Sequence, residues 1–196
     1  MSFMQALRQR WNDADSLVCV GLDPEPAKFP ASFHGDADAV TANPYLGRDS
    51  LQPFLDRADK GVVILCRTSN PGAGDLQDLV AQTGDGVARP LYQHVAAKVA
   101  SQWNTHGNCM LVVGATWPEQ LREVRDIVGE VPFLVPGVGA QGGDVEAVVR
   151  NAKTADGTGL VVSSSRAVLY ASGGNDFAEA AATEAKRLRD EINRYR

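Results

Sequence analysis

Six short, almost continuously apolar runs recur along the chain, and helical patterns separate most of them. Runs of this kind are typical of strands that are buried on both faces of a parallel sheet. They lie at residues 17–22, 39–43, 61–66, 109–114, 132–135 and 159–163. Alternation of such strands with helices predicts βα units and a parallel sheet, in a single α/β domain that spans residues 1–196.

Helical spacing of apolar side chains follows most of these runs. The expected helices lie at 90–103, at 117–128, from 145 onward behind a capping Asp144, and at about 176–195. The first fifteen residues also form an amphipathic pattern, with Phe3, Leu7 and Trp11 on one face. We expect this segment to dock on the domain as a helix, because it lacks the apolar stretch and the cleavage site of a targeting signal.

One connection does not contain a helical pattern. Residues 23–38, which join the first run to the second, read DPEPAKFPASFHGDAD, with three prolines and no helical period. A parallel crossover normally needs a helix or at least about a dozen residues, so this connection is barely long enough. The first βα unit is therefore expected to be shortened.

Charge and cysteine content exclude several classes of partner. The net charge of −5 disfavours non-specific binding to nucleic acid or to an anionic membrane, and no run approaches the roughly 18 apolar residues of a membrane span. Three cysteines in or beside apolar runs, without a secretory signal, indicate buried thiols in a reducing, cytoplasmic compartment. The three histidines have no metal-ligand spacing, so no metal site is predicted, and His94 is expected at the protein surface.

Polar residues follow nearly every apolar run, and the loops after the last two runs are the most informative. The fifth run is followed by PGVGAQGGD and the sixth by SSSRA. In a (β/α)8 barrel the loops after the last two strands commonly bind phosphate. Glycine lets backbone N–H groups approach an anion, and arginine can hold two phosphate oxygens. We therefore predict a phosphate-monoester site formed by Gly137, Gly139, Gly142, Ser165 and Arg166.

Each of these features also has a plainer interpretation. The glycine loop alone could be a tight turn, and it matches neither the P-loop nor the dinucleotide-binding pattern. Asp23 could cap a turn or bind the hydroxyl groups of a sugar. Ser69 and Asn70 could be turn formers in front of Pro71. The pairing of the glycine loop with the Ser-Ser-Arg run is what favours an anion site.

Six segments resemble, in the same order, the orotidine 5′-phosphate decarboxylase family, and most closely its longer bacterial subgroup. They are GLDPEPAKFP, TANPYLGRDSLQPFL, CRTSNPGAGDLQ, VVGATWPEQL, LVPGVGAQGGD and SSSRAVLYAS. The resemblance implies a (β/α)8 TIM barrel that forms a homodimer with its sites at the dimer interface. It also implies conversion of orotidine 5′-monophosphate (OMP) to UMP and CO2 in de novo pyrimidine biosynthesis, with no metal or organic cofactor.

The resemblance assigns substrate-binding roles to five residues. Asp23 would contact the ribose, and Ser69 would bond to the pyrimidine ring. Gln141 would bridge the base and the phosphate, and Arg166 would clamp the phosphate. Asn43 would line the floor of the site.

The catalytic motif of the family is missing from the sequence. In the family, a motif like D-A-K-R-G-D after the third strand supplies a lysine that protonates the carbon losing CO2, and aspartates that position it. No such motif occurs here, and its expected place coincides with the helix-free connection. About two βα units after the first strand are therefore expected to be missing, and without the lysine we expect turnover to collapse while nucleotide binding persists.

Three functions remain open on these grounds. The first is an orotidine 5′-phosphate decarboxylase whose chain is incomplete as written. The second is a non-catalytic barrel remnant that binds phosphate or nucleotide. A third and weaker interpretation is another phosphate-binding barrel enzyme, such as a sugar-phosphate decarboxylase or isomerase.

Overall fold

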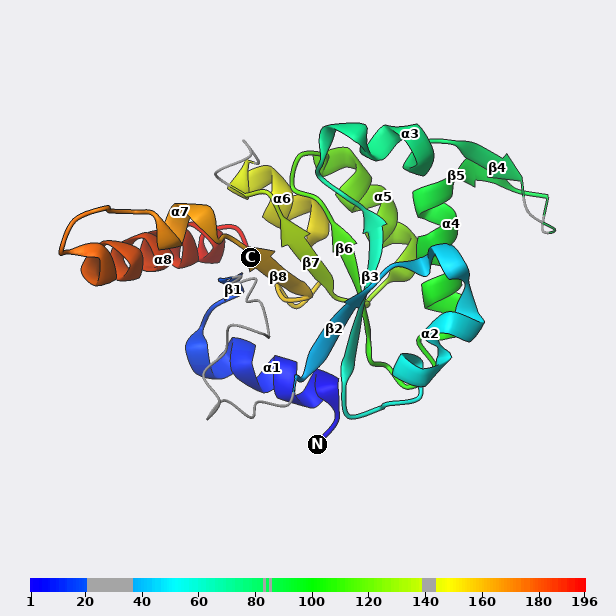
Figure 1. Ribbon diagram of the computed structural model, residues 1–196, viewed down its shortest axis with the longest axis horizontal. Coiled ribbons are helices and arrows are strands. Elements are labelled where there is room, and N and C mark those ends of the chain that lie inside the picture. Colours follow the sequence, from blue (N-terminus) through cyan, green and yellow to red (C-terminus); the bar gives the residue numbers. More distant parts are fainter. Residues whose placement is uncertain (21–36, 83, 85, 139–143) are drawn as a thin grey trace.

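The computed structural model describes residues 1–20, 37–82, 84, 86–138 and 144–196. Its main sheet has six parallel strands in the order β1-β8-β7-β6-β3-β2 (Figure 1). They are β1 (Val18–Cys19), β2 (Ala39–Ala42), β3 (Gly61–Arg67), β6 (Cys109–Val113), β7 (Phe133–Pro136) and β8 (Leu160–Ser163). Each lies within or overlaps one of the six apolar runs, so the predicted parallel α/β sheet is confirmed.

The strand order is that of a TIM barrel from which two neighbouring strands are missing. In a (β/α)8 barrel each strand pairs with the next, and the last strand pairs with the first. Here β8 pairs with β1 through Val162 with Val18 and Ser163 with Cys19, as in the closing step of a barrel. Among the described residues, β1 and β2 are the two edges of the sheet. The curled sheet is thus a six-strand part of a barrel, open after the first strand, where the sequence predicted the loss.

Helices cover the outer face of the sheet (Figure 1). They include α2 (Arg48–Leu55), α4 (Leu91–Lys98) with a π-helical extension at Val99–Trp103, α5 (Pro118–Val128), α6 (Val145–Ala152) and α8 (Phe177–Asn193). The four helices predicted from spacing are therefore present. Shorter helical segments occupy the loops: Pro44–Leu46 (η2), Pro71–Ala73 (η3), Gly74–Gln77 (α3) and Arg166–Leu169 (α7).

Two apolar layers hold the sheet, one on each face. Along β3, Val62 and Ile64 point into the layer beneath the outer helices, whereas Val63 points into an inner cluster, as the two-residue period of a strand requires. The inner cluster contains Phe3 of α1 (Phe3–Ala14). A Cβ added to Gly61 would lie 2.5 Å from the Phe3 ring. The glycine therefore lets α1 close the bottom of the sheet, and the predicted docking helix is confirmed.

An antiparallel hairpin between β3 and α4 was not predicted. Its strands are β4 (Val80–Gln82) and β5 (Ala88–Pro90). The signal was present in the sequence, because Asp-Gly at positions 85 and 86 is a favoured hairpin turn. The hairpin also makes the surface prediction for His94 wrong. His94 is buried, and its Nε2 lies 2.7 Å from the carbonyl oxygen of Ala81 in β4.

The two cysteines in central strands are buried, as the sequence predicted. Burial raises the pKa of both Cys66 and Cys109 to about 12, so these thiols are neutral. In the part of the chain that the structure describes, no group of His, Cys, Asp and Glu is arranged to hold a metal ion. No helix there is long and apolar enough to cross a bilayer.

Candidate functional site

The carboxyl ends of five strands lie along one edge of the sheet. Ser163 of β8 pairs with Cys19 of β1 on one side and with Pro136 of β7 on the other. The N–H of Ala115, after β6, donates to the carbonyl of Pro136 over 2.9 Å, and Gly114 donates to the carbonyl of Arg67 over 2.7 Å. The loops that follow β1, β3, β6, β7 and β8 therefore begin on the same face, which is the functional face of a barrel of this type.

Three of the predicted phosphate ligands begin the loops after β7 and β8. Gly137 follows β7 with a φ of 96°, a conformation that favours glycine. Ser165 is partly buried after β8, and the exposed Arg166 is the first residue of α7. Among the described residues, none forms an ion pair with Arg166. Gly139, Gln141 and Gly142, and also Asp23, lie outside the described residues.

The start of α6, behind the glycine loop, carries negative rather than positive charge. Asp144 caps the helix as predicted, and its side chain accepts a hydrogen bond from the N–H of Glu146 over 2.9 Å. Glu146 adds a second carboxylate in the first turn. These two charges offset the partial positive charge of the helix end. The cationic part of a phosphate site on this face therefore depends on Arg166.

Ser69, the predicted contact of the pyrimidine ring, lies directly over the end of β6. A Cβ added to Gly114 would be 2.7 Å from the Cβ of Ser69 and 2.9 Å from its Cα and backbone nitrogen. Only a glycine at position 114 allows the Ser69 backbone to approach so closely. The sequence quoted this glycine in the segment VVGATWPEQL but gave it no role.

A buried arginine anchors the loop that carries Ser69. Arg67, at the end of β3, is only 1% exposed. Its guanidinium donates to three side chains, those of Gln120 over 2.6 Å, Gln77 over 3.2 Å and Asp78 over 3.2 Å. It also lies 4.9 Å from the ring of Trp117. The sequence analysis noted Arg67 as one polar residue at a strand end and missed this cluster.

Gln77 connects this cluster to the loop backbone. Its side-chain oxygen accepts from the N–H of Thr68 over 2.9 Å as well as from Arg67, and its amide donates to Thr68 Oγ1 over 2.9 Å. Thr68 Oγ1 in turn donates to the side chain of Asn70 over 2.6 Å. Both neighbours of Ser69 are thus held by hydrogen bonds that originate at Gln77.

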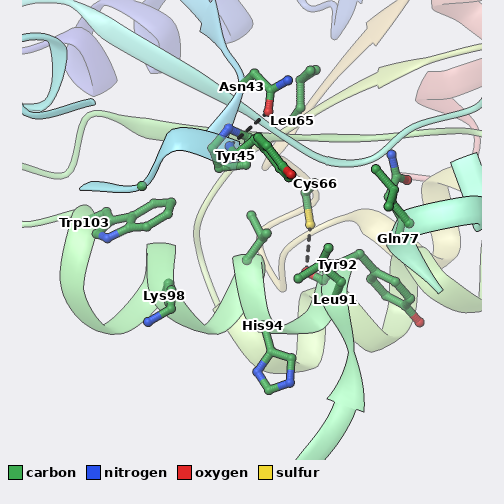
Figure 2. Close-up of a pocket in the computed structure, with 14 residues that line it drawn as sticks. Asn43, Tyr45, Leu65, Cys66, Gln77, Leu91, Tyr92, His94, Lys98 and Trp103 are labelled. Carbon is green, nitrogen blue, oxygen red and sulfur yellow. Dashed lines mark hydrogen bonds between the residues drawn. The ribbon is translucent and has the colours of Figure 1, made fainter. Parts of the chain in front are cut away.

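Asn43 lies apart from these residues, at a separate cavity. Its side-chain oxygen accepts from the N–H of Tyr45 over 3.0 Å and caps η2. The cavity has a volume of about 680 Å³ and lies between η2 and α4 (Figure 2). Its lining includes Leu65, Leu91 and Trp103 but none of Ser69, Gly137, Ser165 and Arg166. This cavity is therefore distinct from the face where the predicted phosphate ligands begin.

Residues 24–182 match the family model of the orotidine 5′-phosphate decarboxylase / HUMPS family. The chain belongs to this family. The orotidine 5′-phosphate decarboxylase of Cellvibrio japonicus (strain Ueda107) is 42% identical over 274 residues, which cover 98% of this chain and 98% of the relative. That of Janthinobacterium sp. (strain Marseille) is 58% identical over 159 residues, 81% of this chain and 57% of the relative. The solved structure of Leishmania donovani OMP decarboxylase has 31% identity and a TM-score of 0.78, covering 100% of this chain and 98% of that one.

The alignment with the Cellvibrio japonicus decarboxylase also measures the missing part of the barrel. It extends over 274 positions, 78 more than the 196 residues of this chain. Because nearly all of both proteins is covered, these extra positions lie opposite an internal gap. A barrel of about 250 residues has about 30 residues in each of its eight units, so the gap is long enough for two units. The strand order places those units between β1 and β2.

Proposed function

We propose that this protein is a carboxy-lyase of the orotidine 5′-phosphate decarboxylase type, and that this chain forms the nucleotide-binding part of the active site. The reaction is the conversion of OMP to UMP and CO2. The observation that carries the proposal is the shared carboxyl edge, where Ser69, Gly137, Ser165 and Arg166 begin loops on one face in a chain of this family. Residues 1–196 would be one TIM-barrel domain that lacks two of its units.

The phosphate of the nucleotide would bind after β7 and β8. Arg166 would donate two hydrogen bonds to phosphate oxygens, and N–H groups of Ser165 and of Gly137, Gly139 and Gly142 would complete the cradle. The exposed position of Arg166 leaves its guanidinium accessible to such a ligand.

The nucleoside would lie across the ends of β1, β3 and β6. Ser69, held by the Gln77 hydrogen bonds, would bond to the pyrimidine ring. Asp23 would contact the ribose, and Gln141 would bridge base and phosphate. Asn43 would line the floor of the site, although its side-chain oxygen also caps η2.

Decarboxylation itself needs a group that this sequence lacks. Loss of CO2 leaves a carbanion on the pyrimidine ring, and this carbanion needs an adjacent cation and a proton donor in a preorganised site. Phosphate binding accelerates the reaction only where that reacting centre is also present. The lysine motif of the family would belong to the units that the relatives have between the positions of β1 and β2. We therefore expect this chain alone to bind nucleotide but to turn over OMP very slowly.

A homodimer in the cytoplasm is the expected setting. Several large apolar side chains near η2 and α3 are exposed, among them Tyr45 at 80%, Leu46 at 73% and Leu76 at 56%. Tyr45 and Leu76 also line the same cavity, so this apolar surface is continuous and suits contact with a second copy. We expect no nucleic-acid or membrane partner, in keeping with the net charge of −5.

Titration with UMP and with uridine, together with an OMP decarboxylation assay and an intact mass, tests this function. A mass of 20.9 kDa with tighter binding of UMP than of uridine and very slow turnover is the expected result. Full turnover at that mass would contradict the need for the family lysine. Equal affinity for UMP and uridine would contradict the phosphate site. Binding with no turnover under any condition would favour the non-catalytic remnant.

A further inference from the structure

The open side of the sheet is formed by β2, and its exposure is unusual for a strand of a parallel barrel. Among the described residues, β2 has a strand neighbour on one side only, which is β3. Ala39, Val40 and Thr41 are all exposed, whereas every residue of β6 in the middle of the sheet is buried. Strands of parallel barrels are normally covered on both faces, so β2 has the sequence of a buried strand in an exposed position.

The register identifies which backbone groups of β2 face this open side. Ala39 pairs with Gly61 and Thr41 with Val63, and the N–H of Gly61 donates to the carbonyl of Asp38 over 2.8 Å. In a parallel ladder the residues on either side of a paired position bond to the neighbour, and orientation alternates along the strand. The N–H and C=O groups of Asp38 and Val40 therefore point to β3. Those of Ala39 and Thr41 point away from it.

Apolar side chains beside this edge form a place for a further helix. Val40 is 40% exposed and Phe54 of α2 is 45% exposed. Both line a cavity of about 300 Å³, together with Pro53 and Val62. In a βα barrel the helix that precedes a strand packs beside that strand on the outer face. A chain segment that pairs with β2 would therefore also cover this cavity.

We propose that the β2 edge binds a separate polypeptide of two βα units, equivalent to the 78 positions that the Cellvibrio japonicus decarboxylase has and this chain lacks. Such a segment supplies the two strands that the interval between β1 and β2 requires, and a helix for the cavity at Val40 and Phe54. Its activity readout rests on the proposed function, but its binding does not.

A second copy of this chain fits the edge less well. Two copies related by a two-fold axis would pair β2 with β2 in antiparallel orientation, through only four residues in each strand. That pairing leaves the interval between β1 and β2 open in both copies. At the other edge, the N–H of Val18 already donates to Ser16 Oγ over 3.1 Å, so β2 is the edge that remains for strand addition.

Co-expression of the full 196-residue chain with the unmatched segment of the Cellvibrio japonicus relative tests this inference. The segment carries a solubility tag, so that it is recovered whether or not it binds. We expect a one-to-one complex by size exclusion with light scattering, and slower hydrogen exchange at the N–H groups of Ala39 and Thr41. The complex should decarboxylate OMP at least ~100-fold faster than either part, the lower end of what a positioned proton donor contributes.

Two variants locate the binding to this edge. Thr41→Pro removes an N–H that points to the open side and leaves the β3 ladder intact, so it should weaken the complex at least ~10-fold, while the matched Thr41→Val should not. Val40→Lys places a charge on the apolar surface that the segment would cover, at a position where the free chain tolerates it. Val40→Lys decides the question if circular dichroism shows that Thr41→Pro does not fold.

The outcomes separate this inference from the proposed function. Absence of a complex, or a complex that Thr41→Pro and Val40→Lys leave unchanged, overturns the inference. Self-association of the chain that Thr41→Pro abolishes assigns the edge to a second copy and also overturns it. A single chain with the same segment inserted between β1 and β2 is the control for function. If that chain and the complex both form but neither is active, the proposed function fails while the inference stands.

Discussion

Arg67 and Arg125 are both buried, at 1% and 7% exposure, but their guanidinium groups are held in different ways. Arg125 of α5 donates only to backbone carbonyls, those of Gly129, Val131, Ala152 and Gly159, and lies 3.9 Å from the Phe133 ring. Arg67 donates to the side chains of Gln77, Asp78 and Gln120. The first arginine fixes the main chain where β7 and β8 begin, and the second fixes the loop where β3 ends.

This difference follows the two ends of the barrel. At the amino ends of the strands, an arginine that bonds to carbonyls joins segments regardless of their side chains, so it contributes to stability. At the carboxyl ends, an arginine that bonds to side chains orients one particular loop, which carries Ser69. Stability at one end and function at the other is the usual division in this fold. Substitutions at each end should therefore affect different measurements.

Arg125→Met should give the largest effect, and that effect should be on stability. The substitution leaves four buried carbonyl groups without their donor, and losses of this kind cost about 3–5 kcal/mol. Urea unfolding measures the change in the free energy of unfolding. The control is Arg122→Met one turn earlier on α5, where the exposed guanidinium donates only to the carbonyl of Arg150 over 3.3 Å. Equal effects of the two substitutions would contradict a special role for Arg125.

Arg166→Ala should affect binding and leave stability unchanged. Loss of hydrogen bonds from a charged group should weaken UMP binding by about 1.5–3 kcal/mol, measured by isothermal titration calorimetry. Uridine affinity and the urea midpoint should not change, because the side chain is exposed. Arg189→Ala, on the surface of α8, serves as the matched control. A similar loss of UMP affinity in both variants would show that overall charge, and not a phosphate site, is responsible.

Gln77→Met should have a smaller effect that appears in both measurements. It removes the acceptor for the Thr68 N–H and one acceptor for Arg67, at a cost of about 1–2 kcal/mol in stability. Because the Ser69 loop is then less fixed, UMP affinity should fall while ribose 5-phosphate affinity stays constant. Gln82→Met in the exposed hairpin, where the side chain donates to the carbonyl of Gly86, should change neither affinity. A parallel loss for both ligands would place Gln77 outside the base-binding part.

The sequence predicted the fold well because its signal is local and repeated. Each run of Val, Ile and Leu marks a strand, and each helical period marks a helix, so the parallel sheet and the missing units could be inferred before the structure. The Arg67 cluster could not be inferred, because Gln77 and Gln120 reach Arg67 from helices that only the folded sheet brings together. His94 was misplaced for the same reason, since the hairpin that covers it packs from outside its own helix. The predicted roles of Asp23, Asn43, Ser69, Gln141 and Arg166 remain predictions.

Asp156→Asn should give the smallest effect, at the same end of the barrel as Arg125, and only above acidic pH. The Asp156 carboxylate accepts hydrogen bonds from Thr154 Oγ1 over 2.6 Å and from the N–H and Oγ1 of Thr158. These bonds, that from Thr154 first, lower its pKa from 3.8 to about 2. A lowered pKa in the folded state means that the stabilisation is present above about pH 4 and is lost as pH falls towards 2. The side chain is half exposed, which limits the effect to at most about 1 kcal/mol.

Urea unfolding of the unmutated chain and of Asp156→Asn at several pH values between about 6 and 2 checks this sign. The unmutated chain should be more stable at neutral pH, and the two free energies of unfolding should converge as pH approaches 2, because Asn cannot be protonated in this range. Asp13→Asn, on the exposed side of α1, controls for the loss of one negative charge from the protein. Curves that stay parallel down to pH 2 would show that Asp156 contributes through packing of the Thr154–Thr158 turn rather than through its charge.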